Sequence, residues 1–247
     1  MTVIWTPGSS GKLKLVKDPV PDIIRTNLTL NLDPNDTPSS SGSTLYDLTG
    51  TSNATLENAP THNSDIGYYD YDGVNQHLSR SEPLITGTND LTFEIWFNID
   101  TISGSWNPSY TGARIFYHPF FLGAELQIVS FNGQPWLLAF KQNGTGFGPT
   151  WNVLGTIVNG SWYQFVLTQD STNNAQVVYI NGTQAYTAFE TRSWGTPSGG
   201  DMYFLMNPLG PDGAFNGKVG EIRAYNSVLT ASEVSNNWEA RRWRYGL

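Results

Sequence analysis

Short runs in which hydrophobic and polar residues alternate recur along the chain after residue 26. In the first run, Leu28, Leu30 and Leu32 alternate with polar residues, as expected for a strand with one buried face. Further runs of strand type follow at residues 45–48, 68–71, 91–99, 114–121, 125–131, 136–141, 152–158, 162–168, 176–180, 184–189, 202–206 and 218–225. Many short strands at this spacing predict an all-β sandwich or barrel.

Two Asn-Gly pairs separate neighbouring runs. Asn132-Gly133 and Asn181-Gly182 each lie between two runs, and both favour the left-handed backbone of a tight hairpin turn. If the strands from Leu91 onward form a meander, loops 142–150 and 190–200 share one end of the sandwich. Loops 102–113 and 208–216 then share the other end.

One segment near the C-terminus has the pattern of a helix. Thr230-Ala231-Ser232-Glu233 is a capping box, in which the Thr hydroxyl and the Glu carboxylate each accept a hydrogen bond from backbone N–H groups. Leu229 and Val234 can make the flanking apolar contact, and Trp238 lies on the same face as Val234. We expect a helix over residues 230–242 that packs on the edge of the sandwich.

Residues 1–25 show no amphipathic period and contain three prolines, so they predict an extended arm before a domain at 26–247. Within the arm, one alternating stretch predicts a single edge strand whose lysines block unwanted pairing. This stretch is the candidate attachment segment, and it consists of Lys12, Leu13, Lys14, Leu15, Val16 and Lys17. It can add a strand to a neighbour's sheet. Docking of the arm on its own domain is the alternative.

The charges are distributed unevenly. The chain has 13 basic and 21 acidic residues, and seven of the basic residues lie in segments 1–25 and 241–247. The acidic body disfavours nucleic acid as a partner. The basic ends, including Arg241, Arg242 and Arg244, either bind an acidic protein neighbour or are solvated.

The residue types and segments of the chain exclude disulfides, thiolate sites and membrane-spanning segments. Cysteine is absent, which excludes disulfides and thiolate sites. No apolar run is long enough to insert in a membrane, and residues 1–11 do not resemble a signal peptide. We therefore expect synthesis in the cytoplasm of a host cell.

Several groups of residues carry a family resemblance and follow one another in order. They are Thr29-Leu-Asn-Leu-Asp33-Pro-Asn-Asp36, Thr44-Leu-Tyr-Asp47-Leu-Thr-Gly50, Asn53 to Pro60, Tyr71 to Asn75, Leu91 to Phe97, Val177 to Gly182, Phe215 to Tyr225, Leu229 to Glu233 and Arg244-Tyr-Gly246. Together they resemble the laminin-G-like, concanavalin A-like domains found in the virion proteins of tailed bacteriophages.

The resemblance implies a two-layer antiparallel jelly-roll sandwich with an extended N-terminal arm and a short C-terminal helix. It also implies a non-enzymatic virion protein, a capsid decoration or a tail or fibre component, present in many copies. The arm would bind other capsid or tail proteins while the jelly roll faces outward. The alternative function is a carbohydrate-binding module or adhesin that recognises glycans of the host surface.

Catalytic residues are hard to find in the sequence. Glycosidases need two carboxylates facing one cleft. The central strand run supplies one candidate, Glu94, while Glu125, Glu190 and Glu221 are each isolated. We expect no enzyme, and an endo-glycanase acting through Glu94 is the alternative.

Calcium is the metal that the resemblance suggests. Asp33, Asp36 and Asp47 match family positions and offer the oxygen ligands that calcium prefers. A structural calcium ion is therefore one expectation, with no other cofactor. Turn hydrogen bonds made by Asp33 and Asp47 are the alternative.

Loop aromatics are the candidate sugar contacts. Phe147, Trp151 and Trp194 would form one rim if their loops share an end of the sandwich, and Trp106 and Tyr110 would lie at the other end. The same residues can instead fix long loops to the body or make subunit contacts.

Overall fold

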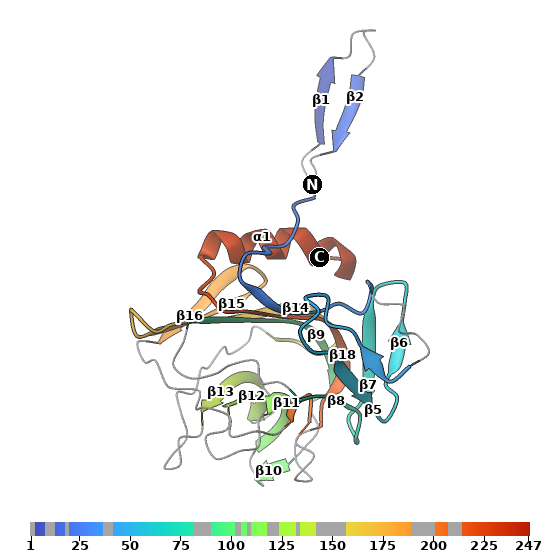
Figure 1. Cartoon of the computed structure of the whole chain (residues 1–247), viewed down its shortest axis with the longest axis vertical. Coiled ribbons are helices and arrows are strands. Elements are labelled where there is room, and N and C mark those ends of the chain that lie inside the picture. The colour runs from blue at the N-terminus through green and yellow to red at the C-terminus, as the bar shows by residue number, and fades with distance from the viewer. Residues whose placement is uncertain are drawn as a thin grey trace.

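The computed structural model describes residues 3–7, 13–17, 20–36, 42–81, 90–101, 105–107, 110–117, 124–131, 134–141, 157–188, 201–206 and 214–247. Two antiparallel sheets face each other in these ranges, and one helix lies across the outer face of one sheet (Figure 1). The predicted two-layer antiparallel jelly-roll architecture with a short C-terminal helix is confirmed.

The sheet beneath the helix, called here the helix-side sheet, has the strand order β16-β15-β14-β9-β18-β7-β6, with β3 also paired to β18. Its strands are β3 (Leu28–Leu32), β6 (Thr61–Asn63), β7 (Tyr68–Asp72), β9 (Leu91–Thr101), β14 (Trp162–Asp170), β15 (Ala175–Ile180), β16 (Thr183–Ala188) and β18 (Asn216–Tyr225).

The opposite sheet, called here the far sheet, has the order β13-β12-β11-β17-β8-β5-β4, with β10 paired to β11. Its strands are β4 (Thr44–Leu45), β5 (Ala54–Glu57), β8 (His77–Arg80), β10 (Ser105–Asn107), β11 (Tyr110–Tyr117), β12 (Ala124–Phe131), β13 (Gln134–Lys141) and β17 (Met202–Phe204). The short strands β5, β8 and β10 were not expected, and the sequence pattern there is too brief to show a period.

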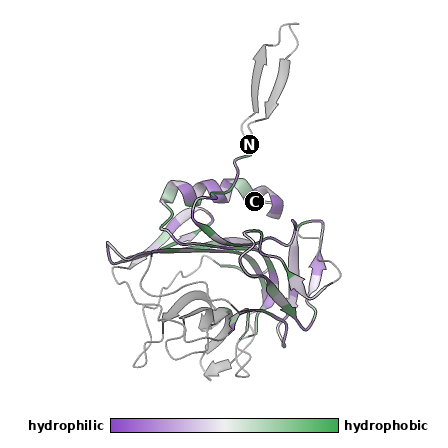
Figure 2. Cartoon of the chain, in the orientation of Figure 1, coloured by the Kyte–Doolittle hydropathy of each residue, from purple (hydrophilic) through white to green (hydrophobic). Residues whose placement is uncertain are grey.

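The main core lies between the two sheets. Phe93, Ile95 and Phe97 of β9 project into it together with Phe165 of β14 and Phe204 of β17, and all five are fully buried. Hydrophobic residues are concentrated along these strands (Figure 2). Burying five large apolar side chains stabilises the sandwich by roughly 8–15 kcal/mol before the cost of ordering the chain is counted.

The helix α1 (Ala231–Arg241) closes a second apolar cluster on the other face of the helix-side sheet. Val234 of the helix and Leu229 before it pack there against Val166, Tyr179 and Tyr225 of the sheet. Because both faces of the sheet are covered, β9 is buried along nine consecutive residues. The segment continues from α1 as a short 3₁₀ helix, η1 (Arg242–Tyr245).

Local signals in the sequence are confirmed at the helix and at one turn. Thr230 Oγ1 accepts a hydrogen bond from Glu233 N at 3.3 Å, and a Glu233 carboxylate oxygen accepts one from Thr230 N at 2.8 Å. Asn181 and Gly182 both have positive φ, as a two-residue hairpin turn between β15 and β16 requires. Asn132-Gly133 lies outside the described residues, although Phe131 and Gln134 on either side of it pair across β12 and β13.

The predicted strand at 152–158 lies mostly outside the described residues, and its last two residues, 157 and 158, belong to no strand. The predicted meander from Leu91 onward was wrong, because β9 pairs with β14 and β18 while β11, β12 and β13 belong to the far sheet. From β9 onward, the chain therefore changes sheet after β9, after β13, after β16 and again after β17.

The arm contains a strand at Leu13–Lys17 (β2), as predicted, but its partner was not foreseen. β2 pairs antiparallel with β1 (Val3–Pro7), and the two form a sheet of their own. The predicted attachment residues Leu13, Lys14, Leu15, Val16 and Lys17 are thus part of a hairpin, and Lys12 lies outside the described residues.

Candidate functional site

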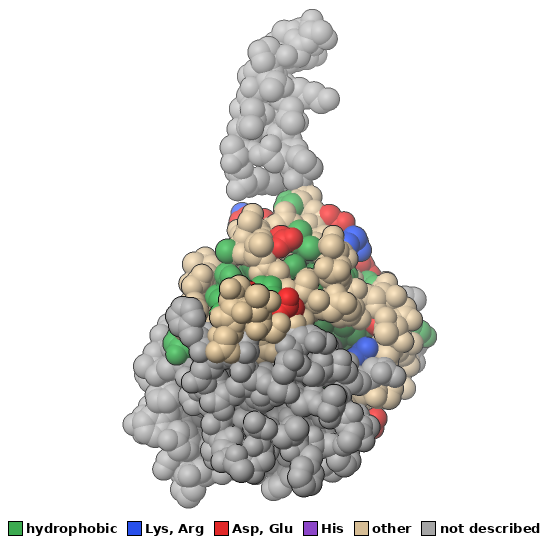
Figure 3. Space-filling view, turned by 60° about the vertical axis from the view of Figure 1, so that its left-hand side comes forward, with side chains coloured by type: hydrophobic (Ala, Val, Ile, Leu, Met, Phe, Trp, Pro, Cys, Tyr) green, Lys and Arg blue, Asp and Glu red, His purple; other side chains and the backbone are tan. Residues whose placement is uncertain are grey.

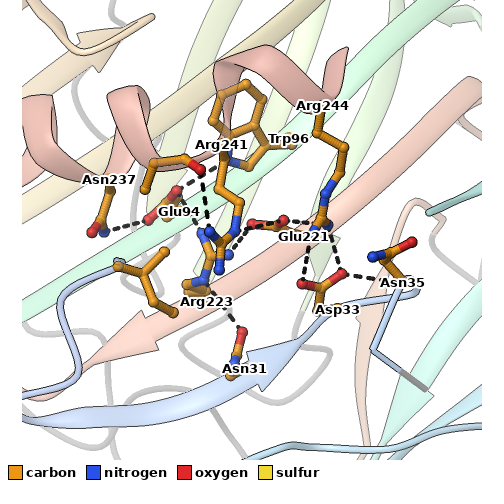
Figure 4. Close-up of polar contacts among 12 residues, drawn as sticks. Asn31, Asp33, Asn35, Glu94, Trp96, Glu221, Arg223, Asn237, Arg241 and Arg244 are labelled. Carbon is orange, nitrogen blue, oxygen red and sulfur yellow. Dashed lines mark hydrogen bonds and ion pairs between the residues drawn. The ribbon is translucent and has the colours of Figure 1, made fainter. Parts of the chain in front are cut away.

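The densest polar arrangement among the described residues lies between α1 and the helix-side sheet. It contains three carboxylates and three guanidinium groups that come from four parts of the chain (Figure 4). The acids are Asp33, Glu94 and Glu221, and the bases are Arg223, Arg241 and Arg244. We call these six residues the buried ion-pair cluster.

Glu94 lies at one end of the cluster. Its strand directs it away from the main core, because its neighbours Phe93 and Ile95 fill that core. One carboxylate oxygen accepts hydrogen bonds from Trp96 Nε1 at 3.0 Å, Gln164 Nε2 at 2.9 Å and Arg223 Nη1 at 2.9 Å. The side chain is fully buried, so the only acid that the sequence offered for catalysis is a packing and pairing residue.

Glu221 lies at the centre of the cluster, and both its oxygens face guanidinium groups. Arg223, two residues along β18, contacts one oxygen, while Arg244 and Arg241 contact the other, the Arg241 Nε atom at 3.1 Å. β18 has a bulge between Val219 and Ile222, which changes the face on which successive residues lie. The bulge therefore lets Glu221 and Arg223 share the helix-covered face with Glu94.

Asp33 and Arg244 close the other end of the cluster. The Arg244 guanidinium donates to both Asp33 oxygens, at 2.8 and 3.2 Å, and the Asp33 side chain is 1% exposed. Burial opposes the charged form of Arg244, but the hydrogen bond and the charge of Asp33 raise its pKa above the ordinary value. Burial and the nearby Arg223 lower the pKa of Arg241. Three negative and three positive groups balance, which buried charges require.

Asn237 extends the cluster to the helix and to the start of the domain. Its Nδ2 donates to Glu94 at 2.9 Å and to the Tyr225 hydroxyl at 2.9 Å, and its Oδ1 accepts from Ile24 N at 2.8 Å. Asparagine is a poor helix former, so its place in the middle of α1 was the one local signal of this role. This role of Asn237 was not predicted from the sequence.

The expectation for the C-terminal arginines was wrong for Arg241 and Arg244. They neither wait for an acidic neighbour nor extend into solvent, because both are largely buried against Glu221 and Asp33. Arg242 is the solvated member, paired on the surface with Glu239 at 2.7 Å. A basic sequence run thus divides between core and surface according to the helical period.

The three aspartates proposed for calcium are not brought together. Asp33 holds Arg244, and Asp47 accepts from the N–H groups of Asn31, Thr49 and Ser52. Asp36 is exposed. Turn and ion-pair hydrogen bonds therefore occupy Asp33 and Asp47, and the described ranges contain no group of three histidine or acidic residues that could hold a metal ion.

The candidate sugar-binding aromatics fall mainly where no side chain is described. Phe147, Trp151 and Trp194 lie outside the described residues, and only the backbone is described at Trp106 in β10 and Tyr110 in β11. The strand directions still bear on the predicted rim. β13 and β17 run in opposite directions in the far sheet, so Lys141, where β13 ends, and Met202, where β17 begins, lie at the same end of the strands. Segment 142–156 follows Lys141, and segment 189–200 precedes Met202.

The face drawn in Figure 3 shows no concentration of one charge among its described residues. On the face drawn in Figure 3, acidic and basic side chains are scattered among polar ones. In the part of the chain that the structure describes, no helix combines the length and the apolarity needed to cross a membrane.

Comparisons with known proteins agree with this architecture. The sequence matches the model of the laminin G 3 family, of the concanavalin A-like lectin/glucanases superfamily, over residues 72–235. No curated protein sequence matches significantly.

Solved structures share the fold at low sequence identity. Domain 4 of AbnA, a GH43 extracellular arabinanase from Geobacillus stearothermophilus, in complex with arabinotriose, has a TM-score of 0.61 and 19% identity over 85% of this chain and 98% of that one. The binding domain of botulinum neurotoxin serotype D has a TM-score of 0.63 and 11% identity over 87% of this chain and 52% of that one. A Trypanosoma rangeli sialidase has a TM-score of 0.58 and 15% identity over 88% and 34%.

This chain spans about half of the neurotoxin chain and a third of the sialidase chain. The likeness to these structures shows the fold alone, whereas the family match covers most of the sequence. The two facing antiparallel sheets and the match over residues 72–235 together establish that the chain belongs to the concanavalin A-like lectin/glucanases superfamily.

Proposed function

We propose that this chain is a non-catalytic glycan-binding module that is held by its arm and binds through the loop end of the far sheet. The observation that carries the proposal is that Lys141 and Met202 lie at the same end of the far-sheet strands. Segment 142–156, which carries Trp151, begins after Lys141, and segment 189–200, which carries Trp194, finishes before Met202. Flat aromatic faces cover the apolar side of a sugar ring, which is the chemistry that this rim would supply.

Two further findings support recognition without catalysis. Glu94 is fully buried and accepts four hydrogen bonds from protein groups, so a substrate cannot reach it. The similar domain 4 of AbnA is in complex with arabinotriose. A glycan at the surface of such a module needs shape and hydrogen bonds but no paired acids.

A purified-protein glycan array at about 0.1 mM, a concentration that detects sub-millimolar affinities, tests the proposal. We expect saturable binding that weakens in Trp151→Ala and Trp194→Ala. The matched control is Trp243→Ala, because Trp243 is 59% exposed and lies in η1 on the helix side. An array without hits, or equal loss in all three variants, contradicts the proposal.

The finer role that we propose is display on a virion, as a capsid decoration or a tail or fibre component present in many copies. The supporting observation is where the arm joins the domain. Asn236 Nδ2 donates to Asp22 O at 2.7 Å and Asn237 accepts from Ile24 N, so residues 22–24 are held on α1. The hairpin β1–β2 therefore leads to the helix side, and the far sheet stays available for a ligand.

Deletion of residues 1–19 tests this role. The truncated protein should unfold with the same midpoint as the full chain but should fail to join purified particles. Residues 20–25 are kept because Ile23 is buried and Ile24 packs against the cluster under α1. Normal incorporation of the truncated protein would contradict attachment through the hairpin.

A further inference from the structure

Four side chains of different chemistry form a row across four adjacent strands of the helix-side sheet, on its helix-covered face. The strand registers pair Trp162 with Asn98, Asn98 with Lys218, and Lys218 with Asp70. At least one residue next to each of them belongs to the main core between the sheets, and both do around Asn98, where Phe97 and Ile99 are core residues. The row itself must therefore lie on the opposite face, beside η1.

Three aromatic rings, one each from β14, β7 and η1, form a corner beside this row. Trp162 lies with its ring centroid 4.4 Å from that of Tyr245, which supports it from the side of η1. Tyr68 lies 5.6 Å from Trp162, with the two ring planes at 59°. Tyr245 is buried, whereas Tyr68 and Trp162 are partly exposed, so the corner between these two rings faces solvent.

The polar members of the row surround this corner. Lys218 Nζ donates to both Asp100 carboxylate oxygens at 2.7 Å, and Asp70 lies beside Lys218 on the next strand. Asn98 Nδ2 donates to Gly160 O at 3.1 Å, but its Oδ1 atom is buried and has no hydrogen-bond partner among the described residues. The Asn98 residue as a whole is 6% exposed. A buried amide oxygen without a donor is costly, and a ligand hydroxyl can satisfy it only when the side chains that cover it move aside.

We propose that Tyr68, Asp70, Asn98, Trp162 and Lys218 form a second carbohydrate subsite, which takes a neutral sugar residue. Aromatic rings pack against the C–H faces of a sugar, while the amide and carboxylate oxygens accept hydrogen bonds from its hydroxyls. Two carboxylates and one ammonium group give the patch, with Asp100 included, one net negative charge. A sialic or uronic acid would meet like charge there.

This subsite deepens the proposed function. The class of its ligand rests on the proposed glycan binding, whereas its location on the helix-side sheet does not depend on that proposal. It shares no residue with the far-sheet loops that carry Trp151 and Trp194. A module with both sites would bind a branched or surface-bound glycan at two points, which raises its overall affinity without any new contact.

Two-dimensional NMR of the full chain tests the subsite without altering it. The probes are maltotriose, cellotriose, xylotriose and arabinotriose as neutral ligands, and 3′-sialyllactose and trigalacturonate as acidic ones. We expect at least one neutral trisaccharide to shift the side-chain signals of Asn98 and the indole signal of Trp162. The acidic probes should leave both unchanged.

Variants then test which residues contribute to the binding of the trisaccharide. Tyr68→Ala and Asp70→Asn should each weaken the binding of that trisaccharide by about tenfold, measured by titration at unchanged unfolding midpoint. Tyr46→Ala and Asp65→Asn are the matched controls, because Tyr46 and Asp65 are exposed residues that do not belong to the proposed subsite. Trp162→Phe keeps a ring against Tyr245 and should show a smaller loss than Tyr68→Ala.

The outcomes separate the two proposals. Neutral-sugar binding that is lost in Trp151→Ala and Trp194→Ala but unchanged in Tyr68→Ala and Asp70→Asn refutes the subsite and leaves the proposed function intact. Tighter binding of 3′-sialyllactose at Asn98 refutes the charge argument for a neutral ligand. No binding of any probe, and no array hit, refutes both proposals.

Discussion

Arg244 and Asp33 are 211 residues apart in the chain, and yet the guanidinium of one donates to both carboxylate oxygens of the other. The contact joins η1 to the residue that follows β3, and through Glu221 it reaches the centre of the sheet. Residues after α1 are therefore part of the folded domain rather than a tail. The cohesion of its N-terminal and C-terminal parts depends on charges as well as on apolar packing.

Removal of one partner from this pair should be costly. Arg244→Ala leaves Asp33 buried and without its cation, so the free energy of unfolding should fall by about 3–5 kcal/mol. Urea unfolding followed by tryptophan fluorescence measures the change. Arg242→Ala is the control, because its pair with Glu239 is exposed and should be worth less than about 1 kcal/mol. Similar losses in the two variants would show that the cluster is not a buried unit.

Glu94→Gln keeps the shape of the side chain but removes the charge that faces Arg223. We expect a loss of about 3 kcal/mol in the free energy of unfolding, because Arg223 then has only Glu221 as a counter-ion. Glycan binding should not change. Glu239→Gln, at an exposed helix position, serves as the control. A variant of normal stability with altered binding or activity would mean that ligands reach Glu94 after all.

Two glycines have nearly the same backbone conformation but different surroundings. Substituting each of them distinguishes the cost of backbone strain from the cost of a steric clash. Gly182 has φ +73°, and a Cβ atom there would come within 2.8 Å of Trp238, whereas Gly160 has φ +78° and open space around it. Gly160→Ala should cost about 1 kcal/mol for the left-handed backbone alone. Gly182→Ala should cost about 1–3 kcal/mol more, because the turn must move away from the helix. Equal thermal shifts would mean that the turn does not press on Trp238.

Asp70 gives a pH dependence of definite sign. Burial is the main cause that raises its pKa above 3.8, with Asp100 adding to it, while Lys218 acts in the opposite direction. Between the unfolded pKa and the raised folded pKa the native state binds more protons, so this group makes the protein less stable as pH rises through that window. The unfolding free energy of the wild type minus that of Asp70→Asn should therefore fall as pH rises from the ordinary pKa of 3.8 through the raised pKa of the folded state. A rising difference would contradict the burial of this carboxyl.

Much of the fold could be predicted from the sequence because its signals are local. The capping box at Thr230, the Asn181-Gly182 turn and the alternation at Leu28, Leu30 and Leu32 each depend on a few adjacent residues. The strand order could not be obtained in this way. Which sheet a strand joins depends on contacts such as that of β9 with β18, more than a hundred residues later.

The polar interior was the part that sequence reasoning missed. Glu221 was judged an isolated residue and Arg223 was not considered, although a charged pair two positions apart in an apolar strand is unusual and was a signal. Their partners come from β9, from α1 and η1, and from the segment after β3. No local pattern states that three acids and three bases from such distant segments will meet under one helix.

The position of Arg244 has a consequence during synthesis of the chain. Until that residue has left the ribosome, Asp33 and Glu221 lack part of the positive charge that their burial demands, and the cluster beneath α1 is incomplete. One face of the central sheet therefore stays without its full cover until η1 emerges. During that interval the uncovered face is open to chaperones and to other growing chains.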